Sequence, residues 1–373
     1  MSELRQLAAR NLRAGRCAWR RGLHLCGLYR PQLAPVNIVV ERADWVLKRF
    51  GEEIVEHVNS NHPGAAAVTT APDLMVGTTV HFASQYMWLT WGPHMSRSNR
   101  FVVSFFHGKR EDGDDIDRHI DLFLESVARL SRIVTAASII EQRLVSWGVD
   151  PQRIVRIPLG VDTQVFRFPD TQQRTAARRR FKVPDGALCI GSFQKDGVGW
   201  GEGNEPKLIK GPDLFVEAVA RIARERPVHV LLTGPARGYV KQGLASHGIS
   251  FHHEYLKDQR ELTACYHALD LYLVTSREEG GPLALLESMA TGVPVVSTPV
   301  GMSPDVIDDG RTGGLADVDA DKIGERAVNL LADADALTVL KDNARERVLA
   351  CDWREVARQH HDLVYRPLIG ELS

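Results

Sequence analysis

Two glutamates, Glu279 and Glu287, stand eight positions apart in a glycine-rich and then apolar stretch of the chain. Glu287 lies among leucines and alanines, where a buried ionised carboxylate is costly unless a partner hydrogen-bonds to it. We therefore expect Glu287 to have either a protein partner, such as a basic residue, or a ligand. Because an ionised carboxylate only accepts hydrogen bonds, the vicinal hydroxyls of a ribose are a suitable ligand.

The residues between the two glutamates favour an anion. Gly280 and Gly281 allow the backbone to approach a ligand closely, and Pro282 suits the first turn of a helix. The free amides at the start of that helix, together with its dipole, attract phosphate. The stretch therefore predicts a site for a nucleotide with a pyrophosphate, attached to a group that Glu279 contacts.

The elements that must position these residues follow from hydrophobic patterning. Short apolar runs alternate with segments of helical periodicity, which predicts an α/β fold with mostly parallel sheets covered on both faces. A polar and basic connector before residue 184 separates two such series, which predicts two Rossmann-like domains in tandem. Ligands of such sheets bind at the carboxyl ends of strands, and Glu279 follows one of them closely. We expect strands at 36–40, 101–106, 133–135, 154–157, 187–190, 228–234, 249–251, 271–275 and 294–297.

The composition is typical of a soluble globular protein with about two domains. Of 373 residues, 44% are hydrophobic and 25% are charged, and the formal net charge of -1 favours no nucleic-acid partner. The five cysteines show no CxxC spacing, which predicts reduced thiols and no zinc site. No apolar run reaches the roughly 18 residues that span a bilayer. The expected localisation is cytoplasmic, with the inner face of the membrane as an option.

The first thirty residues carry seven arginines against one acid, Glu3, with leucine and tryptophan between them. This pattern is typical of a segment that lies on an anionic membrane surface. A solvated or frayed basic arm is the alternative interpretation. A signal peptide is not expected, because the segment has no long apolar core and no small-residue cleavage site.

The pair Glu279 and Glu287, spaced as E-x7-E and followed by Gly292–Val296, resembles a motif of the retaining GT-B glycosyltransferases of family 4, the group 1 glycosyl transferases. Ile157–Asp162 and Lys210–Asp213 resemble the same family in order and spacing. The resemblance implies two Rossmann-like domains facing across a cleft. It also implies retaining transfer of a hexose from a nucleotide-diphospho-sugar to a glycan, lipid-linked or small-molecule acceptor, in cell-surface polysaccharide or glycolipid biosynthesis. The donor is a co-substrate, and no metal or other cofactor is expected.

The resemblance also implies roles for single residues. Glu279 would contact the donor sugar, His107 would lie near that sugar, and Lys210 would neutralise the leaving diphosphate. Glu287 would bind the ribose, so that the two glutamates are binding residues rather than the paired carboxyls of a glycosidase. The segment around Gly234 would contact the nucleobase. The backbone that would meet the phosphates or the sugar is that of Gly280, Gly281, Pro282 and Leu283.

Two departures from the family motifs bear on the function. Members usually carry an arginine after the glycine of the strand that precedes the motif lysine, whereas this chain has Ser192, which we still expect to be donor-binding. Lys195 or Lys207 is the expected replacement, and Lys195 lies nearer to the strand end. The glycine-rich loop expected after the first strand is also missing, which leaves the acceptor open.

The departures keep two other functions open. One is a nucleotide-sugar-binding protein without transfer activity, and the other is a peripheral membrane protein whose functional surface is its basic N-terminus.

For the domains, we expect a basic arm at 1–30, an N-terminal acceptor domain at 31–165 and a C-terminal donor domain at 166–352. A C-terminal helix at 353–373 is expected to return to the N-terminal domain.

Overall fold

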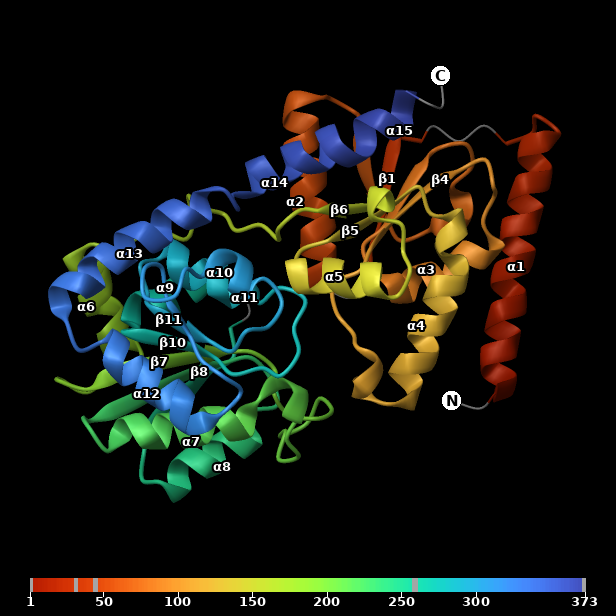
Figure 1. The fold of residues 1–373 in the computed structure, drawn as a ribbon. Helices are drawn as coiled ribbons and strands as arrows, with labels where there is room; N and C mark the ends of the chain where they lie inside the picture. Colours follow the sequence, from red (N-terminus) through yellow and green to blue (C-terminus); the bar gives the residue numbers. More distant parts are fainter. Residues whose placement is uncertain (1–2, 30–32, 43–45, 257–260, 371–373) are drawn as a thin grey trace. The chain divides into compact units, whose positions relative to one another are not determined.

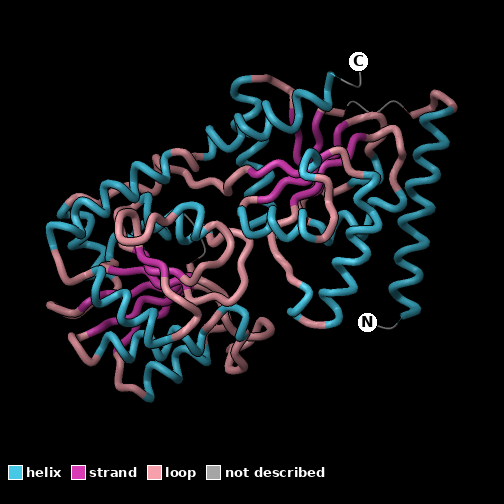
Figure 2. Tube along the Cα trace, in the orientation of Figure 1, coloured by secondary structure: helices cyan, strands magenta, loops and turns pink. Residues whose placement is uncertain are grey.

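The computed structural model describes residues 3–29, 33–42, 46–256 and 261–370, without the side chains of residues 3–7. The chain forms two compact units, which we call unit 1 (residues 1–159 and 353–373) and unit 2 (residues 160–352). Each unit is built on a parallel sheet of six strands with helices around it (Figures 1 and 2). The predicted α/β class with two Rossmann-like domains is confirmed. Unit 1 ends at Leu159, six residues before the boundary expected at 165.

Unit 1 has the strand order β2-β1-β3-β4-β5-β6, and all neighbours are parallel. Its strands are β1 (Val36–Val39), β2 (Ala66–Thr69), β3 (Thr79–Phe82), β4 (Arg100–Ser104), β5 (Arg132–Thr135) and β6 (Ile154–Arg156). Its α-helices are α1 (Glu3–Leu25), α2 (Val46–Asn61), α3 (Gln85–Trp91), α4 (Asp114–Ser126), α5 (Ser138–Ser146), α14 (Trp353–Gln359) and α15 (Arg366–Gly370). Short 3-10 turns are η1 (Pro72–Leu74), η2 (Gly92–His94), η3 (Arg110–Asp112), η4 (Val127–Arg129) and η5 (Pro151–Arg153), and η8 (His360–Tyr365) is a π-helix.

The C-terminal helices of the chain belong to unit 1 and pack on its core. The ring of Trp353 in α14 meets Phe50 of α2 edge to face, with 6.2 Å between the ring centroids. His81 of β3 lies with its Nδ1 atom 2.7 Å from the hydroxyl of Tyr365 in η8. The last helices therefore complete the core on which the sheet of unit 1 depends.

The basic N-terminal segment is helical over α1 and is part of unit 1. Cys17 on this helix is 6% exposed, and the guanidinium of Arg16 pairs with Asp73 of η1 at 2.8 Å. Over residues 8–29, where side chains are described, the frayed alternative is therefore wrong, whereas most of these side chains are exposed to solvent. Within the described part of the chain, no helix is both long enough and apolar enough to cross a bilayer.

Unit 2 has the strand order β12-β11-β10-β7-β8-β9, again with parallel neighbours. Its strands are β7 (Leu188–Phe193), β8 (Val228–Thr233), β9 (Ser250–Glu254), β10 (Leu271–Val274), β11 (Val295–Ser297) and β12 (Gly314–Leu315). Its helices are α6 (Thr171–Arg180), α7 (Pro212–Ala223), α8 (Gly238–Ser246), α9 (Leu262–Ala268), α10 (Leu283–Ala290), α11 (Ser303–Val306), α12 (Ala320–Leu330) and α13 (Ala334–Leu349), with the 3-10 turn η6 (Leu208–Lys210).

The nine strands expected from apolar runs are all present, with ends shifted by no more than three residues. The strands β7 and β8 are longest, and every residue of β8 is buried, as the near-continuous apolar run of that segment predicts. Three short strands, β2, β3 and β12, were not expected. The sequence of β3 is Thr79-Val80-His81-Phe82, in which polar and apolar residues alternate, so it has no uninterrupted apolar run.

The strand order of unit 2 creates a point at which ligands of such sheets bind. The chain runs from β7 outward to β8 and β9, and then returns to the other side of β7 to form β10. The connections that follow β7 and β10 therefore leave the carboxyl edge in opposite directions. Open parallel sheets bind ligands in the crevice at such a switch point. Lys195 and Glu279 lie in these two connections.

Candidate functional site at the carboxyl edge of unit 2

Lys210 and Glu279, which are far apart in sequence, form one charged centre. The ammonium of Lys210 lies 2.5 Å from Oε1 of Glu279, and the hydroxyl of Ser276 donates to the same oxygen at 2.9 Å. The side chains of Lys210 and Glu279 are 25% and 14% exposed. The centre is therefore largely enclosed yet reachable by a ligand.

The turn η6 places Lys210 at this centre. It ends at Gly211, whose φ of 64° lies in the left-handed region that favours glycine. The hydroxyl of Thr275, directly after β10, donates to the carbonyl of Gly211 at 2.9 Å. A Cβ atom at Gly211 would lie 1.8 Å from the carbonyl oxygen of Thr275. The turn thus fits against the end of β10 only with glycine at this position.

A second connection fixes the same turn from the other side. The backbone N–H of Arg277 donates to the carbonyl of Ile209 at 2.8 Å, and its guanidinium donates to that of Leu208 at 2.7 Å. The same guanidinium forms two bonds with Asp213 at the start of α7, at 2.8 and 2.6 Å. These contacts hold the lysine turn, the end of β10 and the start of α7 in one arrangement.

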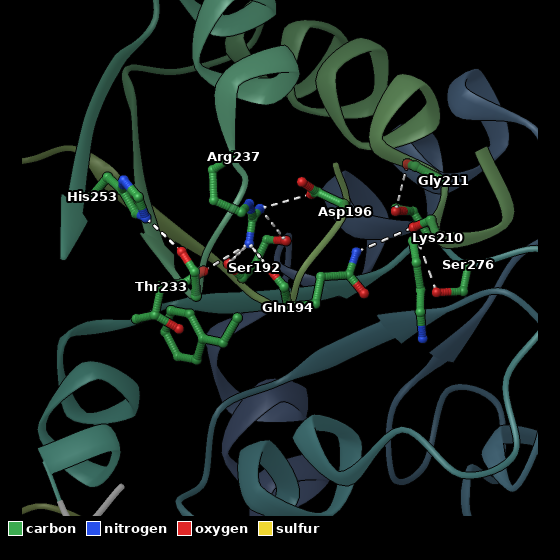
Figure 3. A network of polar contacts seen from close by, with 12 residues as sticks. Ser192, Gln194, Asp196, Lys210, Gly211, Thr233, Arg237, His253 and Ser276 are labelled. Carbon is green, nitrogen blue, oxygen red and sulfur yellow. Dashed lines mark hydrogen bonds and ion pairs between the residues drawn. The ribbon is translucent and has the colours of Figure 1, made fainter. Parts of the chain in front are cut away.

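The guanidinium of Arg237 is buried among oxygen atoms at the ends of β7 and β8 (Figure 3). Its Nη1 donates to the carbonyls of Ser192, Gln194 and Thr233 at 2.8, 2.6 and 3.0 Å. Its Nη2 donates to the hydroxyl of Ser192 at 2.9 Å and lies 3.0 Å from Oδ2 of Asp196. Ser192, expected among the donor-binding residues, is 1% exposed and lies beneath the surface, where both of its oxygens bind Arg237.

Arg237 and Asp196 form an ion pair with both side chains fully buried. Burial raises the pKa of Asp196 to about 6, although the positive charge of Arg237 acts in the opposite direction. Burial likewise lowers the pKa of Arg237, against the effect of Asp196. Because an unpaired buried charge is strongly destabilising, each member requires the other. The pair fixes the start of the connection that follows β7.

That connection, residues 194–207, is a compact hairpin. The N–H of Lys207 donates to the carbonyl of Asp196 at 2.8 Å, and that of Val198 donates to Glu205 at 2.9 Å. The carbonyl of Glu202 accepts from Gly238 at the start of α8 at 2.7 Å. The hairpin therefore holds its lysines at the sheet edge in a defined arrangement.

Three lysines lie close enough to influence one another at this edge. Burial, and then the positive charges of Lys210 and Lys195, lower the pKa of Lys207, while Glu279 acts in the opposite direction. The ammonium of Lys195 lies 3.9 Å from the ring centre of Trp200. Three cations gathered in this way favour an anion such as a diphosphate. Both candidates for the cation that the motif lacks at Ser192 are thus at this edge.

Glu287 is the fifth residue of α10 and is 6% exposed. The hydroxyl of Tyr266, from the buried face of α9, donates to Oε2 of Glu287 at 2.8 Å. Burial, and then the negative charge of Glu287, raise the pKa of Tyr266 well above its ordinary range. Glu287 therefore has a protein partner, which is a neutral phenol. This partner uses one of the about four acceptor positions of a carboxylate.

The segment between the two glutamates leads into α10. Gly280 is buried, whereas Gly281, Pro282 and Leu283 are partly exposed, and Pro282 directly precedes the helix. The segment 299–301 packs against it, because a Cβ atom at Gly301 would lie 2.9 Å from the carbonyl oxygens of Glu279 and Gly280. The amino terminus of α10, with its positive dipole end, thus lies at the switch point.

The remaining candidates lie at sheet edges. Gly234 follows β8 with φ of 86°, and Nε2 of His253 donates to its carbonyl at 2.8 Å. His107 belongs to unit 1, where it is exposed in the connection after β4. The amide of Gln85 donates to the carbonyl of His107 at 3.1 Å, and the two rings of His107 and Tyr86 lie 6.4 Å apart.

Comparisons with known proteins show what this part of the chain is similar to. Residues 203–333 match the family model of the glycosyl transferases group 1. The D-inositol 3-phosphate glycosyltransferase of Stackebrandtia nassauensis is 29% identical over 253 residues, which are 62% of this chain and 54% of that protein. The enzyme of the same name from Geodermatophilus obscurus is 31% identical over 245 residues, which are 61% of this chain and 50% of that protein. The chain thus spans about half the length of these curated relatives.

The fold agrees with that assignment. A crystal structure of Anabaena HepE in complex with UDP-glucose superposes with a TM-score of 0.72 at 14% sequence identity, and covers 90% of this chain and 99% of that one. The matched family segment contains Lys210 and Glu279, which contact each other at the switch point of unit 2, and Glu287 of α10. Residues 203–333 are thus similar to the group 1 glycosyl transferases, and the chain has the two-domain GT-B fold.

Proposed function

We propose that the protein is a retaining glycosyltransferase, which moves a sugar from a nucleotide-diphospho-sugar to an acceptor hydroxyl. The observation that carries this proposal is the contact between Lys210 and Glu279 at 2.5 Å, at the switch point of a parallel sheet. A cation and a carboxylate side by side suit a ligand whose diphosphate and sugar lie next to each other. Retention and a role in cell-surface polysaccharide or glycolipid synthesis rest on the family resemblance.

Each part of the donor finds suitable chemistry. The diphosphate lies against the three lysines and the amino terminus of α10, where charge-assisted hydrogen bonds stabilise its oxygens. Glu279, already accepting from Lys210 and Ser276, turns to the sugar hydroxyls. Glu287, held by Tyr266, accepts from the ribose hydroxyls.

The reaction requires charge stabilisation more than proton transfer in unit 2. When the bond between the sugar and the diphosphate breaks, negative charge grows on the leaving oxygen. Lys210 stabilises this charge in a partly enclosed setting, where such an interaction is stronger than in water. Because Glu279 accepts two hydrogen bonds from protein donors, it acts as a binding carboxylate rather than as a general acid.

The nucleotide is tested with donors of several kinds. Solved structures of the same fold include HepE bound to UDP-glucose, so UDP-glucose, GDP-mannose and dTDP-glucose form the first panel. The purified protein is incubated with each donor without acceptor, and the released nucleoside diphosphate is measured. Slow hydrolysis of one donor supports the proposal, whereas no release from any donor, in this assay or after diverse acceptors are added, contradicts it.

Binding of a donor without its hydrolysis would also have a structural basis. The position after Gly191 carries Ser192, which is buried beneath Arg237, in place of the arginine usual in the family. A protein that binds a nucleotide-sugar without transferring it would keep the diphosphate cradle and lose this cation. Restoration of release by Ser192→Arg is not expected, because the guanidinium of Arg237 already fills the space next to that side chain.

A further inference from the structure

Large apolar side chains of the helix α1 are exposed to solvent, whereas other side chains of the same helix contact the rest of unit 1. Leu12 and Trp19 on this helix are 65% and 60% exposed, whereas Cys17 is 6% exposed. Residues 12 and 19 are seven positions, or about two turns, apart and so share one side of the helix. Cys17 lies roughly opposite, at about 100° per residue. Globular proteins place their apolar residues in the reverse arrangement.

The inner side of α1 is anchored by arginines rather than by leucines. Arg16 pairs with the buried Asp73 at 2.8 Å, and the guanidinium of Arg13 lies 5.8 Å from the ring centre of Trp91. The guanidinium of Arg20 lies 5.0 Å from the ring centre of Tyr29. These contacts fix the rotation of the helix, so the exposure of Leu12 and Trp19 follows from its packing on η1 and α3.

The exposed side carries apolar side chains with positive charge beside them. Arg16 follows Leu12 by four positions and precedes Trp19 by three, and its side chain is 52% exposed. The guanidinium of Arg20 lies 4.9 Å from the ring centre of Trp19. Arg10 and Arg21 are exposed on the opposite side of the helix, and residues 8–29 contain no aspartate or glutamate. Leu25, the last residue of α1, and Leu28 beyond it are 78% and 77% exposed. Tryptophan and leucine with arginine beside them are typical of a helix that lies in the headgroup region of a membrane.

A second copy of the chain fits this side poorly. In a two-fold dimer the same patch meets itself, so Arg16 and Arg20 beside Trp19 in one copy would lie close to the same arginines of the other. Anionic headgroups instead neutralise these arginines, and each basic residue near such a surface contributes about 1 kcal/mol. We propose that the outer side of α1, centred on Leu12 and Trp19, binds the surface of an anionic lipid bilayer. The inference does not depend on the transferase reaction, and its test requires no activity.

The test uses the full chain and two kinds of vesicle, phosphatidylcholine alone and phosphatidylcholine with about a third phosphatidylglycerol. We expect the protein to co-sediment with the anionic vesicles, less with the neutral ones, and less again at high salt. The double variant Leu12→Gln, Trp19→Gln should lower the partition coefficient by about tenfold or more, because it removes the apolar contact. The matched control is Val339→Gln on α13, a residue that is 59% exposed in unit 2.

A charge variant and a folding check complete the test. Arg10→Glu with Arg21→Glu should lower binding to anionic vesicles and leave binding to neutral ones unchanged. Because all four positions are exposed, both double variants should keep the thermal midpoint of the parent protein. The proposal is overturned if the parent does not bind anionic vesicles, or if either double variant binds them as the parent does. It is equally overturned if the protein is a dimer that Leu12→Gln, Trp19→Gln dissociates.

Discussion

The ammonium of Lys210 lies 2.5 Å from the carboxylate of Glu279, and this contact joins the turn before α7 to the connection after β10. It pairs the residue proposed to bind the diphosphate with the residue proposed to bind the sugar. In the absence of ligand each neutralises the other, so neither charge is left unpaired in a partly buried place. A bound donor offers both residues new partners at once.

Glu279→Gln and Glu287→Gln should affect catalysis in different ways. Glutamine at 279 keeps the shape of the side chain but removes the charge next to Lys210, so we expect kcat to fall by about 100-fold with donor KM little changed. Glutamine at 287 accepts weaker hydrogen bonds from the ribose hydroxyls than glutamate does, so donor KM should rise by about tenfold with kcat little changed. Steady-state kinetics with varied donor measures both. Equal losses of kcat in the two variants, at unchanged KM, would be incompatible with the proposed roles.

Tyr266→Phe tests whether the tyrosine orients Glu287. The variant removes the hydroxyl that donates to Oε2 at 2.8 Å and leaves the ring, which lies 4.9 Å from that of Phe193. We expect the free energy of unfolding to fall by about 1–2 kcal/mol and donor KM to rise by about threefold. Urea denaturation and initial-rate kinetics measure these changes. Lower stability with an unchanged KM would mean that the tyrosine supports the fold but not the ribose contact.

Asp196→Asn should change how stability depends on pH. Burial raises the pKa of Asp196 from 3.8 to about 6, so between these values the folded protein binds the proton more tightly than the unfolded chain does. This group therefore contributes stability at low pH that is lost as pH rises through about 6, on the order of 3 kcal/mol.

The measurement is the difference in free energy of unfolding between the parent and Asp196→Asn, taken from pH 4 to pH 7. The neighbouring charged groups are Arg237 and the lysines of the same edge, and their contributions largely cancel in the difference. The stability of the parent relative to the variant should fall across this range and stay constant above it. If the difference in free energy of unfolding does not vary with pH, burial does not raise the pKa of Asp196.

His360 should act in the opposite direction in unit 1. Burial lowers the pKa of His360 from 6.5 to about 4, and burial and then His360 lower that of His81. The titratable groups that face His360 are His81 of β3 and Tyr365 of η8, with ring centroids at 6.0 and 6.1 Å. Because the folded state disfavours the proton, stability present above pH 6.5 is lost as pH falls toward 4, on the order of 3 kcal/mol.

His360→Gln removes this titration and can still donate to the carbonyl of Val356, which Nδ1 contacts at 2.9 Å. The variant should lose less stability than the parent between pH 7 and pH 4.5 in thermal denaturation. Equal losses would assign the acid sensitivity to other groups, with His81 the first to test.

The sequence predicts those features that depend on local patterns. Apolar runs located nine strands, and the motif spacing singled out Lys210 and Glu279, which contact each other in the structure. The two-residue strand β12 and the mixed segment of β3 lack such a run, and their pairing depends on neighbouring strands already in place.

The partners of the site residues could not be predicted in this way. Tyr266 stands 21 positions before Glu287, and Arg237 stands 41 positions after Asp196, so no periodicity relates them. Their contacts arise because parallel strands bring distant connections to one edge. The choice between a protein partner and a ligand for Glu287 was open for the same reason. The rotation of α1 was also open, since an amphipathic pattern does not say which side packs on the protein.

The central claim is that a nucleoside diphosphate binds at Lys210, and calorimetric titration of the full chain with UDP, GDP and dTDP tests it most directly. We predict saturable binding of one of them, weakened by Lys210→Ala by about 10- to 100-fold because a charge-assisted hydrogen bond is lost. Lys322→Ala, at an exposed lysine of α12, should bind as the parent does. Binding of no nucleoside diphosphate, or equal binding by Lys210→Ala and the parent, would contradict the account.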